Sequence, residues 1–423
     1  MRILIIVHQF FPEFAGGTER VALNLARMAQ RAGHYVRVLA STVDPERCGG
    51  KAFAASALNE LESVYQGVPV TFIPRAMLPA SADISLDEDE DIVGSLAAWM
   101  RQERFEVAHV MHTMRMGSAI LAAQRIGLPY VLTLTDFFLP CARINLINLK
   151  NQLCLGPDNG RRCSKDCATA PWTAESYIGR FDQARSVLQA AGARIAPSEY
   201  VAARYHDAFE GIEVQTIPHG VDLLALSLAA NHATPPASPK AHLQIVYIGS
   251  IVPQKGLDVL LRALALLPDA VVRLKVIGGA YGNSAYHSEV RSLADSDARI
   301  EFSGSLEASE VFKALGDADL LCLPSKVPET FSLVLHESAA AGVPALVSDL
   351  GAPAQQVAAH QCGGVVAAGD PEAWARAIGD LINSPGILQS WRENLFLPLR
   401  IEEEAFFYES IYQRVRRQHI QST

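Results

Sequence analysis

The 423-residue sequence lacks the long apolar runs of a membrane-spanning protein. No stretch reaches the roughly 18 apolar residues that a spanning helix needs. The apolar run 3–7 is too short, and too soon interrupted by polar residues and Pro12, for a signal peptide. Basic charge is also scarce: 36 lysines and arginines stand against 45 aspartates and glutamates, a net charge of −9. This balance argues against nucleic acid as the main partner, and we expect a cytoplasmic protein.

The sequence also lacks the paired C-x2-C knuckles of common zinc folds, although it holds seven cysteines. Cys141, Cys154, Cys163 and Cys167 fall within one insert, 141–167, with twelve, eight and three residues between them. Four thiolates so close in sequence fit a tetrahedral zinc ion or an iron–sulfur cluster, and disulfides or free thiols are the alternatives. A metal with four protein ligands would be structural, because it leaves no open position for catalysis.

Short β-branched runs alternate with amphipathic helical stretches from end to end. This alternation predicts α/β architecture, with parallel strands covered by helices on both faces. The expected strands are 3–7, 36–39, 70–73, 107–111 and 130–133 in a first series, and 245–248, 274–277, 300–302, 320–323 and 345–347 in a second; the expected helices include 19–31, 92–101 and 402–417.

The break between the two series is rich in proline and small polar residues, at 231–241, and we interpret it as a linker. Two Rossmann-like, doubly wound domains follow, 1–220 and 221–400. Such sheets bind ligands at the carboxyl ends of their strands, and we expect these ends to face a central cleft. The acidic segment 83–91 is interpreted as a solvated loop that caps the next helix.

Two glycine-containing turns are candidates for phosphate binding. Gly16 and Gly17 precede a helix without forming a G-x-G-x-x-G fingerprint, which makes a dehydrogenase less probable. A tight turn is the alternative explanation. Gly249 ends the first strand of the second series, and Lys255–Gly256 stand at the next helix start. A lysine there could neutralise a diphosphate, or could simply be solvated.

The segment 324–349 contains two glutamates separated by seven residues, Glu329 and Glu337. Glu329 is expected on a loop at the carboxyl end of a strand, and Glu337 inside an apolar helix that begins near Ser332. A buried acid needs a partner, and a ligand hydroxyl would serve. The backbone N–H groups of Phe331, Ser332 and Leu333 at the helix start could bind phosphate or a sugar hydroxyl.

In their order along the chain, these glycines, the lysine and the glutamate pair resemble the retaining glycosyltransferases of family 4, which have the GT-B fold. The resemblance covers essentially the whole chain and is most specific in 324–349. It implies an acceptor-binding domain, 1–220, and a nucleotide-sugar-binding domain, 221–400. It also implies that the last helix, 402–418, packs back onto the first domain.

The resemblance further implies retention of anomeric configuration, with no cofactor required for catalysis. Lys255 would stabilise the leaving diphosphate, Glu329 would bind the donor sugar and Glu337 the ribose. Main-chain N–H groups of 331–333 would contact the donor, together with the glycine turns. His112 matches a family histidine placed near the anomeric carbon, whereas we interpret His109, which points the other way along its strand, as structural.

Several positions differ from the family pattern. Ser250 stands where many relatives have an arginine that shares the phosphates with Lys255. Thr135–Asp136 replaces a common His-Asp pair, Ser332 replaces a glycine, and Lys326 occupies a place often held by an aromatic residue. These differences leave the identities of donor and acceptor open.

The predicted reaction moves a sugar from a nucleoside-diphosphate sugar to a hydroxyl of a saccharide or lipid-linked saccharide, in polysaccharide or glycoconjugate biosynthesis. Bacterial-type relatives often work at the inner membrane face, so peripheral membrane contact is a hypothesis. Two alternatives stay open: a GT-B nucleotide-sugar epimerase, and a nucleotide-binding protein that has lost transfer. Donor turnover and product identity would discriminate among them.

Overall fold

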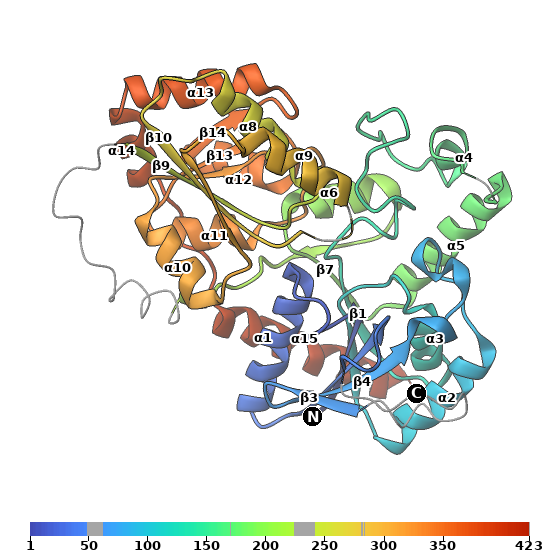
Figure 1. Ribbon diagram of the computed structural model, residues 1–423. Helices are drawn as coiled ribbons and strands as arrows, with labels where there is room; N and C mark the ends of the chain where they lie inside the picture. Colours follow the sequence, from blue (N-terminus) through green and yellow to red (C-terminus); the bar gives the residue numbers. More distant parts are fainter. Residues whose placement is uncertain (49–61, 170, 224–241, 281, 283, 423) are drawn as a thin grey trace. The chain divides into compact units, whose positions relative to one another are not determined.

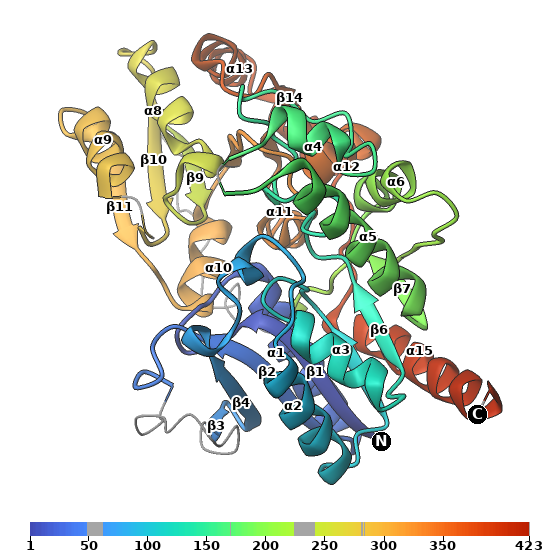
Figure 2. The same cartoon turned by 90° about the vertical axis from the view of Figure 1, so that its right-hand side faces the viewer.

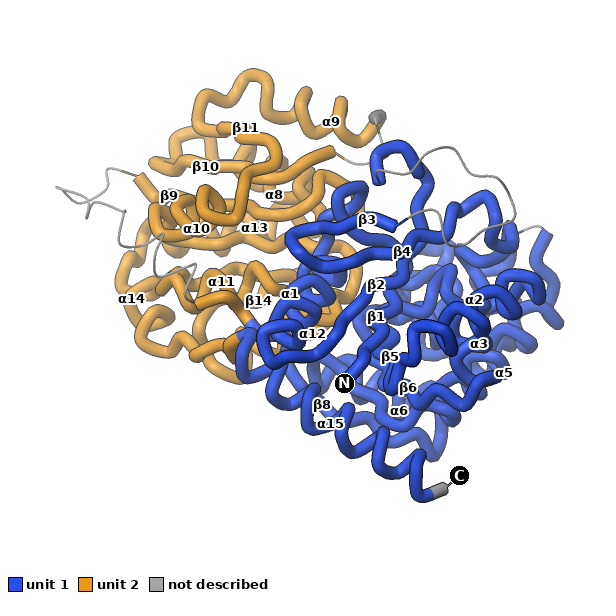
Figure 3. The backbone as a smooth tube through the Cα atoms, turned by 90° about the horizontal axis from the view of Figure 1, so that it is seen from below, with its two compact units in different colours: residues 1–220, 401–423 blue, residues 221–400 orange. Residues whose placement is uncertain are grey.

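The computed structural model describes residues 1–48, 62–169, 171–223, 242–280, 282 and 284–422 (Figure 1). The chain divides into two compact units. Unit 1 comprises Met1–Gly220 and Ile401–Thr423, and unit 2 comprises Val221–Arg400 (Figure 3). The linker that we predicted at 231–241 lies outside the described residues.

Unit 1 contains an eight-stranded sheet in the order β3-β4-β2-β1-β5-β6-β7-β8. Its strands are β1 (Arg2–Gln9), β2 (Tyr35–Thr42), β3 (Glu62–Tyr65), β4 (Val68–Pro74), β5 (Val107–Val110), β6 (Tyr130–Thr133), β7 (Ala193–Ala196) and β8 (Gln215–Thr216). The inner strands are almost wholly buried, as parallel strands covered on both faces should be.

At one edge the sheet includes a strand that the sequence analysis did not predict, β3, which pairs antiparallel with β4. The two strands are joined by Gln66 and Gly67, which both have positive φ angles, 47° and 82°. Two consecutive residues in this region form the tight hairpin turn that matches the twist of paired strands. The local turn therefore determines the direction of β3.

The described helices of unit 1 are α1 (Gly17–Arg31), α2 (Glu90–Gln102), α3 (Gly117–Arg125), α4 (Arg161–Asp166), α5 (Ala174–Ala190), α6 (Glu199–Ala208), α15 (Ile401–Ser422) and the 3-10 turns η1 (Arg75–Met77) and η2 (Ala80–Asp83). Asp89 caps α2, since its carboxylate accepts the amides of Asp91 and Ile92. This confirms the predicted cap.

The last helix, α15, lies against α1, β5 and β6 (Figure 2). A chain of buried polar contacts fixes it there. The two ring nitrogens of His109 contact the Tyr412 hydroxyl at 2.6 Å and the Thr133 hydroxyl at 2.7 Å. Tyr408 contacts Thr133 at 2.8 Å. Both ring nitrogens of His109 thus have partners within the fold, in agreement with the structural role predicted for this histidine.

Unit 2 has a six-stranded parallel sheet in the order β11-β10-β9-β12-β13-β14. Its strands are β9 (Leu243–Ile248), β10 (Val272–Ile277), β11 (Ile300–Gly304), β12 (Leu320–Leu323), β13 (Ala345–Ser348) and β14 (Gly363–Val366). Its described helices are α8 (Leu257–Ala265), α9 (Ser284–Ala294), α10 (Ala308–Asp317), α11 (Leu333–Ala340), α12 (Gly351–His360), α13 (Pro371–Asn383), α14 (Gly386–Glu393) and the 3-10 turn η3 (Pro253–Lys255).

Two apolar clusters fill the two faces of this sheet. One joins α8, α13 and the start of α9, with Trp374 wholly buried, and the other joins α10, α11 and α12. Helices therefore cover both faces, as the alternating pattern predicted.

Candidate functional site

In each unit, chemically active side chains cluster where the strand order changes direction. β1 lies between β2 and β5 in unit 1, and β9 lies between β10 and β12 in unit 2. The loops after β1 and β5 leave toward opposite faces of the sheet, as do those after β9 and β12. Ligands of doubly wound sheets bind at this switch point.

In unit 1 the cluster centres on two stacked histidines, His8 in β1 and His112 just after β5. Their ring centroids are 3.8 Å apart. His112 Nε2 is in contact with the carboxylate of Asp136, which follows β6. The hydroxyl of Thr135 donates to the carbonyl oxygen of Met111 at 2.7 Å and fastens this loop to the end of β5. Neighbouring parallel strands thus bring together residues far apart in sequence.

Glu19 also belongs to this cluster; it lies in the first turn of α1 and is only 2% exposed. Its Oε1 is 3.8 Å from His8 Nδ1. Burial raises the pKa of the Glu19 carboxyl, against the effect of hydrogen bonds from the amides of Glu19 itself and Gly16. Burial also lowers the pKa of His8, helped by the charges of His112 and Arg115. The pair is therefore biased toward its uncharged forms.

This glutamate changes the interpretation of the Gly16–Gly17 turn. Gly16 is the N-cap of α1, and its amide donates to the Glu19 carboxylate, as in half of a capping box. A Cβ atom at Gly16 would overlap that carboxylate oxygen. The glycine therefore lies against an internal acid, and the Gly16 N–H already has a partner.

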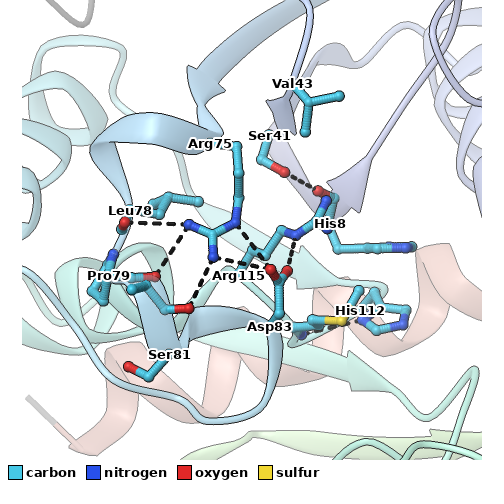
Figure 4. Close-up of polar contacts among 12 residues, drawn as sticks. His8, Ser41, Val43, Arg75, Leu78, Pro79, Ser81, Asp83, His112 and Arg115 are labelled. Carbon is cyan, nitrogen blue, oxygen red and sulfur yellow. Dashed lines mark hydrogen bonds and ion pairs between the residues drawn. The ribbon is translucent and has the colours of Figure 1, made fainter.

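A second cluster in unit 1 joins Arg75, Asp83 and Arg115 (Figure 4). Both guanidinium groups pair with the Asp83 carboxylate, Arg75 at 2.9 Å. Burial would raise the pKa of Asp83, but hydrogen bonds from both arginines outweigh it and lower the pKa. Arg115 adopts a left-handed backbone, with φ 66°, which is uncommon for this residue. Within the acidic segment 83–91, to which no chemistry was assigned, Asp83 is thus a structural ion-pair partner of two arginines.

In unit 2 the predicted Lys255 and Glu329 are in contact, with Nζ 3.0 Å from Oε2. The Ser325 hydroxyl also donates to the Glu329 carboxylate. The backbone of Glu329 is fixed as well, because its carbonyl accepts the amide of Ala352 at 2.8 Å. The acid is therefore held at the carboxyl end of β12, beside the lysine.

The loop that carries Lys255 is shaped by Gly256, which has φ 66°. A Cβ atom there would overlap the carbonyl oxygen of Pro324. Only glycine therefore lets this loop approach the end of β12 so closely. Lys255 itself ends the 3-10 turn η3, and α8 begins at Leu257, so the expectation that Lys255 and Gly256 begin the α-helix is wrong by one to two residues.

Gly249 and Ser250 follow β9, as predicted. The amide of Gly249 donates to the carbonyl of Ile277 at 3.0 Å. The Tyr247 hydroxyl donates to the carbonyl of Ser250 at 3.0 Å. Burial raises the pKa of Tyr247 well above its usual value, so this tyrosine stays neutral and acts as a donor.

The start of α11 agrees with the predicted position. Ser332 is its N-cap and accepts the amide of Leu335 with its side chain, which gives a local reason for serine at this place. Leu333 is the first helical residue, and the Phe331 ring stacks on His336 with centroids 4.0 Å apart. Glu337 is buried on the helix.

The structure gives no support for the metal centre expected at the four clustered cysteines. All four are free thiols, with Cys141 and Cys167 buried. Burial raises the pKa of Cys163 to about 12, and the other three cysteines add to this shift, so the four lie near one another. Even so, in the part of the chain that the structure describes, no group of three or more His, Cys, Asp or Glu side chains is placed to hold a metal ion. The zinc or iron–sulfur interpretation is therefore not supported.

The sequence analysis did not single out three residues of these clusters: His8, Glu19 and Arg115. His8 and Arg115 contact partners that are distant in sequence, His112 and Asp83. His8 was recognisable only in part, because it stands at the end of a predicted strand.

No helix in the described part of the chain combines the length and hydropathy of a membrane-spanning segment.

Comparison with known proteins gives matches along almost the whole chain. The profile of Glycosyltransferase Family 4 matches residues 15–223, and that of Glycosyl transferases group 1 matches residues 231–396. A D-inositol 3-phosphate glycosyltransferase of Xylanimonas cellulosilytica is 26% identical over 404 residues, which cover 88% of this chain and 84% of the relative. A phosphatidyl-myo-inositol mannosyltransferase of Mycobacterium leprae is 31% identical over 194 residues, covering 45% and 50%.

Solved structures show the same fold. A glycosyltransferase from Rickettsia africae superposes with a TM-score of 0.68 at 15% identity, covering 98% of both chains. A sucrose-phosphate synthase from Thermosynechococcus elongatus gives 0.67 at 18%, covering 99% of this chain and 98% of the other. An Anabaena protein solved in complex with UDP gives 0.64 at 16%, covering 100% of both.

Proposed function

Because the chain belongs to the group 1 glycosyltransferases of family 4, we propose that the cluster in unit 2 binds the sugar donor and the cluster in unit 1 the acceptor. The chain is a retaining glycosyltransferase that takes its sugar from a nucleotide sugar. Catalysis in this family needs no metal ion. The charge of the leaving diphosphate must then be stabilised by protein groups.

The observation that supports the donor site best is the contact between Lys255 and Glu329 at the switch point of unit 2. Lys255 Nζ binds the diphosphate and stabilises the charge that develops as the glycosidic bond breaks. Glu329 then accepts hydroxyl groups of the donor sugar. Glu337, buried on α11, accepts the ribose hydroxyls. The N–H groups at the start of α11 face the phosphates.

In unit 1, His112 is the group that meets the reacting end of the sugar. The Asp136 carboxylate contacts its Nε2 and the amide of Met114 donates to its Nδ1, so the ring is held in one orientation, and the stacked His8 limits its rotation. The acceptor hydroxyl attacks the face from which the diphosphate leaves, and a phosphate oxygen takes its proton. The protein contributes positioning and charge, without a covalent intermediate.

The acceptor is a saccharide or a lipid-linked saccharide in glycoconjugate or polysaccharide synthesis. A relative's name specifies an inositol phosphate, which also presents ring hydroxyls. A lipid-linked acceptor would bring this protein to the inner membrane face as a peripheral, otherwise cytoplasmic protein. Co-flotation with anionic vesicles at low salt tests this, and an unbound protein would contradict it.

Thermal unfolding with UDP, GDP and ADP, each added alone, tests the donor site. A ligand at about 100 times its dissociation constant adds roughly 2.7 kcal/mol to the stability of the folded state. We expect one nucleotide to raise the melting temperature, with UDP favoured by the Anabaena complex. Lys255→Ala and Glu337→Ala should abolish the shift, whereas Lys313→Ala, on the exposed side of α10, should keep it. No shift with any nucleotide would refute the assignment.

A further inference from the structure

The loop after β9, residues 249–256, carries a single charged side chain, Lys255, whereas a diphosphate bound there calls for a second positive charge. We propose that Lys326 supplies this second positive charge, from the loop after β12 instead of the loop after β9. The inference rests on the donor site proposed above and names a further diphosphate-binding residue in it.

Lys326 packs against the same loop that carries Lys255. Its amide donates to the carbonyl of Gln254 at 2.8 Å. Its Cγ lies 3.3 Å from the position that a Cβ atom on Gly256 would occupy. The loops after β9 and β12 are therefore in contact through these residues, and each presents one lysine at the switch point of the sheet.

The ammonium group of Lys326 is held by an acid that has its own support. Lys326 Nζ lies 2.6 Å from Asp258 Oδ2. Asp258 Oδ1 accepts the Tyr286 hydroxyl at 2.7 Å, so both carboxylate oxygens are in use. Asp258 also lies in the first turn of α8, where the helix dipole stabilises a negative charge.

Exposure shows which member of each ion pair a ligand can reach. The Lys326 side chain is 35% exposed and that of Asp258 is 11% exposed. The Lys255 and Glu329 side chains show the same contrast. Both lysines are thus open to a ligand while their acids lie more deeply buried. A diphosphate can add to both cations without displacing the buried acids.

A different explanation is that Lys326 only fastens its loop to α8 through Asp258. The two roles predict different binding data. A structural fastener would affect every ligand of the site, whereas a phosphate-binding cation affects only ligands that carry phosphate. The nucleoside alone is therefore the discriminating ligand.

The experiment measures dissociation constants of UDP and uridine for the full-length protein, by calorimetry and by competition. Lys326→Met should weaken UDP binding about tenfold to a hundredfold, as loss of one charge-assisted contact does. Uridine binding should not change. Lys275→Met is the matched control, because Lys275 lies in the same unit, has a similar exposure of 34% and pairs with Glu301. It should bind UDP as the unaltered protein does.

The double variant Ser250→Arg/Lys326→Met returns a cation from the other loop, and we expect it to recover most of the UDP affinity. Unchanged UDP affinity in Lys326→Met, or an equal loss of uridine affinity, would overturn the role of Lys326 alone. If the unaltered protein bound none of UDP, GDP and ADP, the donor site itself would be overturned as well.

Discussion

The buried His109 should make the stability of unit 1 depend on pH in a predictable direction. Burial lowers the pKa of this histidine to about 3, and the charge of His219 contributes. Both of its ring nitrogens are engaged, by Tyr412 on α15 and by Thr133 on β6. In the unfolded chain the same imidazole titrates near its ordinary value, about 6.5.

The direction of the pH dependence is determined by the number of protons that the folded and unfolded states bind. Between about pH 6.5 and 3 the unfolded chain binds a proton at His109 and the folded protein does not, so stability falls as the pH falls through this window. Each pH unit well below 6.5 costs about 1.4 kcal/mol. Over the whole window, His109 alone would cost about 5 kcal/mol. Above pH 7 this loss disappears.

His109→Gln keeps a polar group at this position but does not titrate. We expect its free energy of unfolding, measured in urea, to fall by about 2.5 kcal/mol less than that of the unaltered protein between pH 7 and 4.5, with most of the difference below pH 6.5. The contributions of the other titrating groups are the same in both proteins and cancel in this difference. His206→Gln, at an exposed position on α6, should keep the original slope. Equal slopes for His109→Gln and the unaltered protein would refute the reasoning.

Two further predictions follow from local geometry. Gly256→Ala should abolish nucleotide binding and lower the melting temperature more than Gly342→Ala does, because both glycines have positive φ but only Gly256 would meet a backbone oxygen. The strain common to both substitutions is about 1–3 kcal/mol, so equal effects would contradict the steric argument. For the cysteine insert, metal analysis should find no stoichiometric zinc or iron, and all seven thiols should react with a thiol reagent after unfolding. One metal ion per chain would contradict the free-thiol interpretation.

The predicted strands agree with the structure to within three residues at each end, because buried parallel strands appear in sequence as continuous β-branched runs. The strand β12, residues 320–323, was predicted without error. The strands that were missed lack this signal. In β14, a Cβ atom at Gly363 would overlap the carbonyl oxygen of Ala345, so close packing requires glycine where the pattern would show valine. The edge strand β3 alternates between exposed and half-buried residues.

The positions of the site residues could be predicted only where these residues lie in one continuous segment of the chain. Glu329, Ser332 and Glu337 lie on a single strand–loop–helix, so their spacing predicted their positions. Pairs such as Lys326 with Asp258, which are 68 residues apart, depend on the order of strands in the sheet. Sequence periodicity indicates that strands exist but not which strands are neighbours.

Strand order also explains why either of two loops can supply a charged side chain to the same place. In unit 2, β9 pairs with β12 although two strands separate them in sequence, so two loops meet at one switch point. A cation needed there can come from position 250, after β9, or from position 326, after β12. The fold therefore brings positions 250 and 326 to the same end of the sheet and leaves open which of them carries a charge. A serine at position 250 is then compatible with transfer, provided that Lys326 faces the same phosphates.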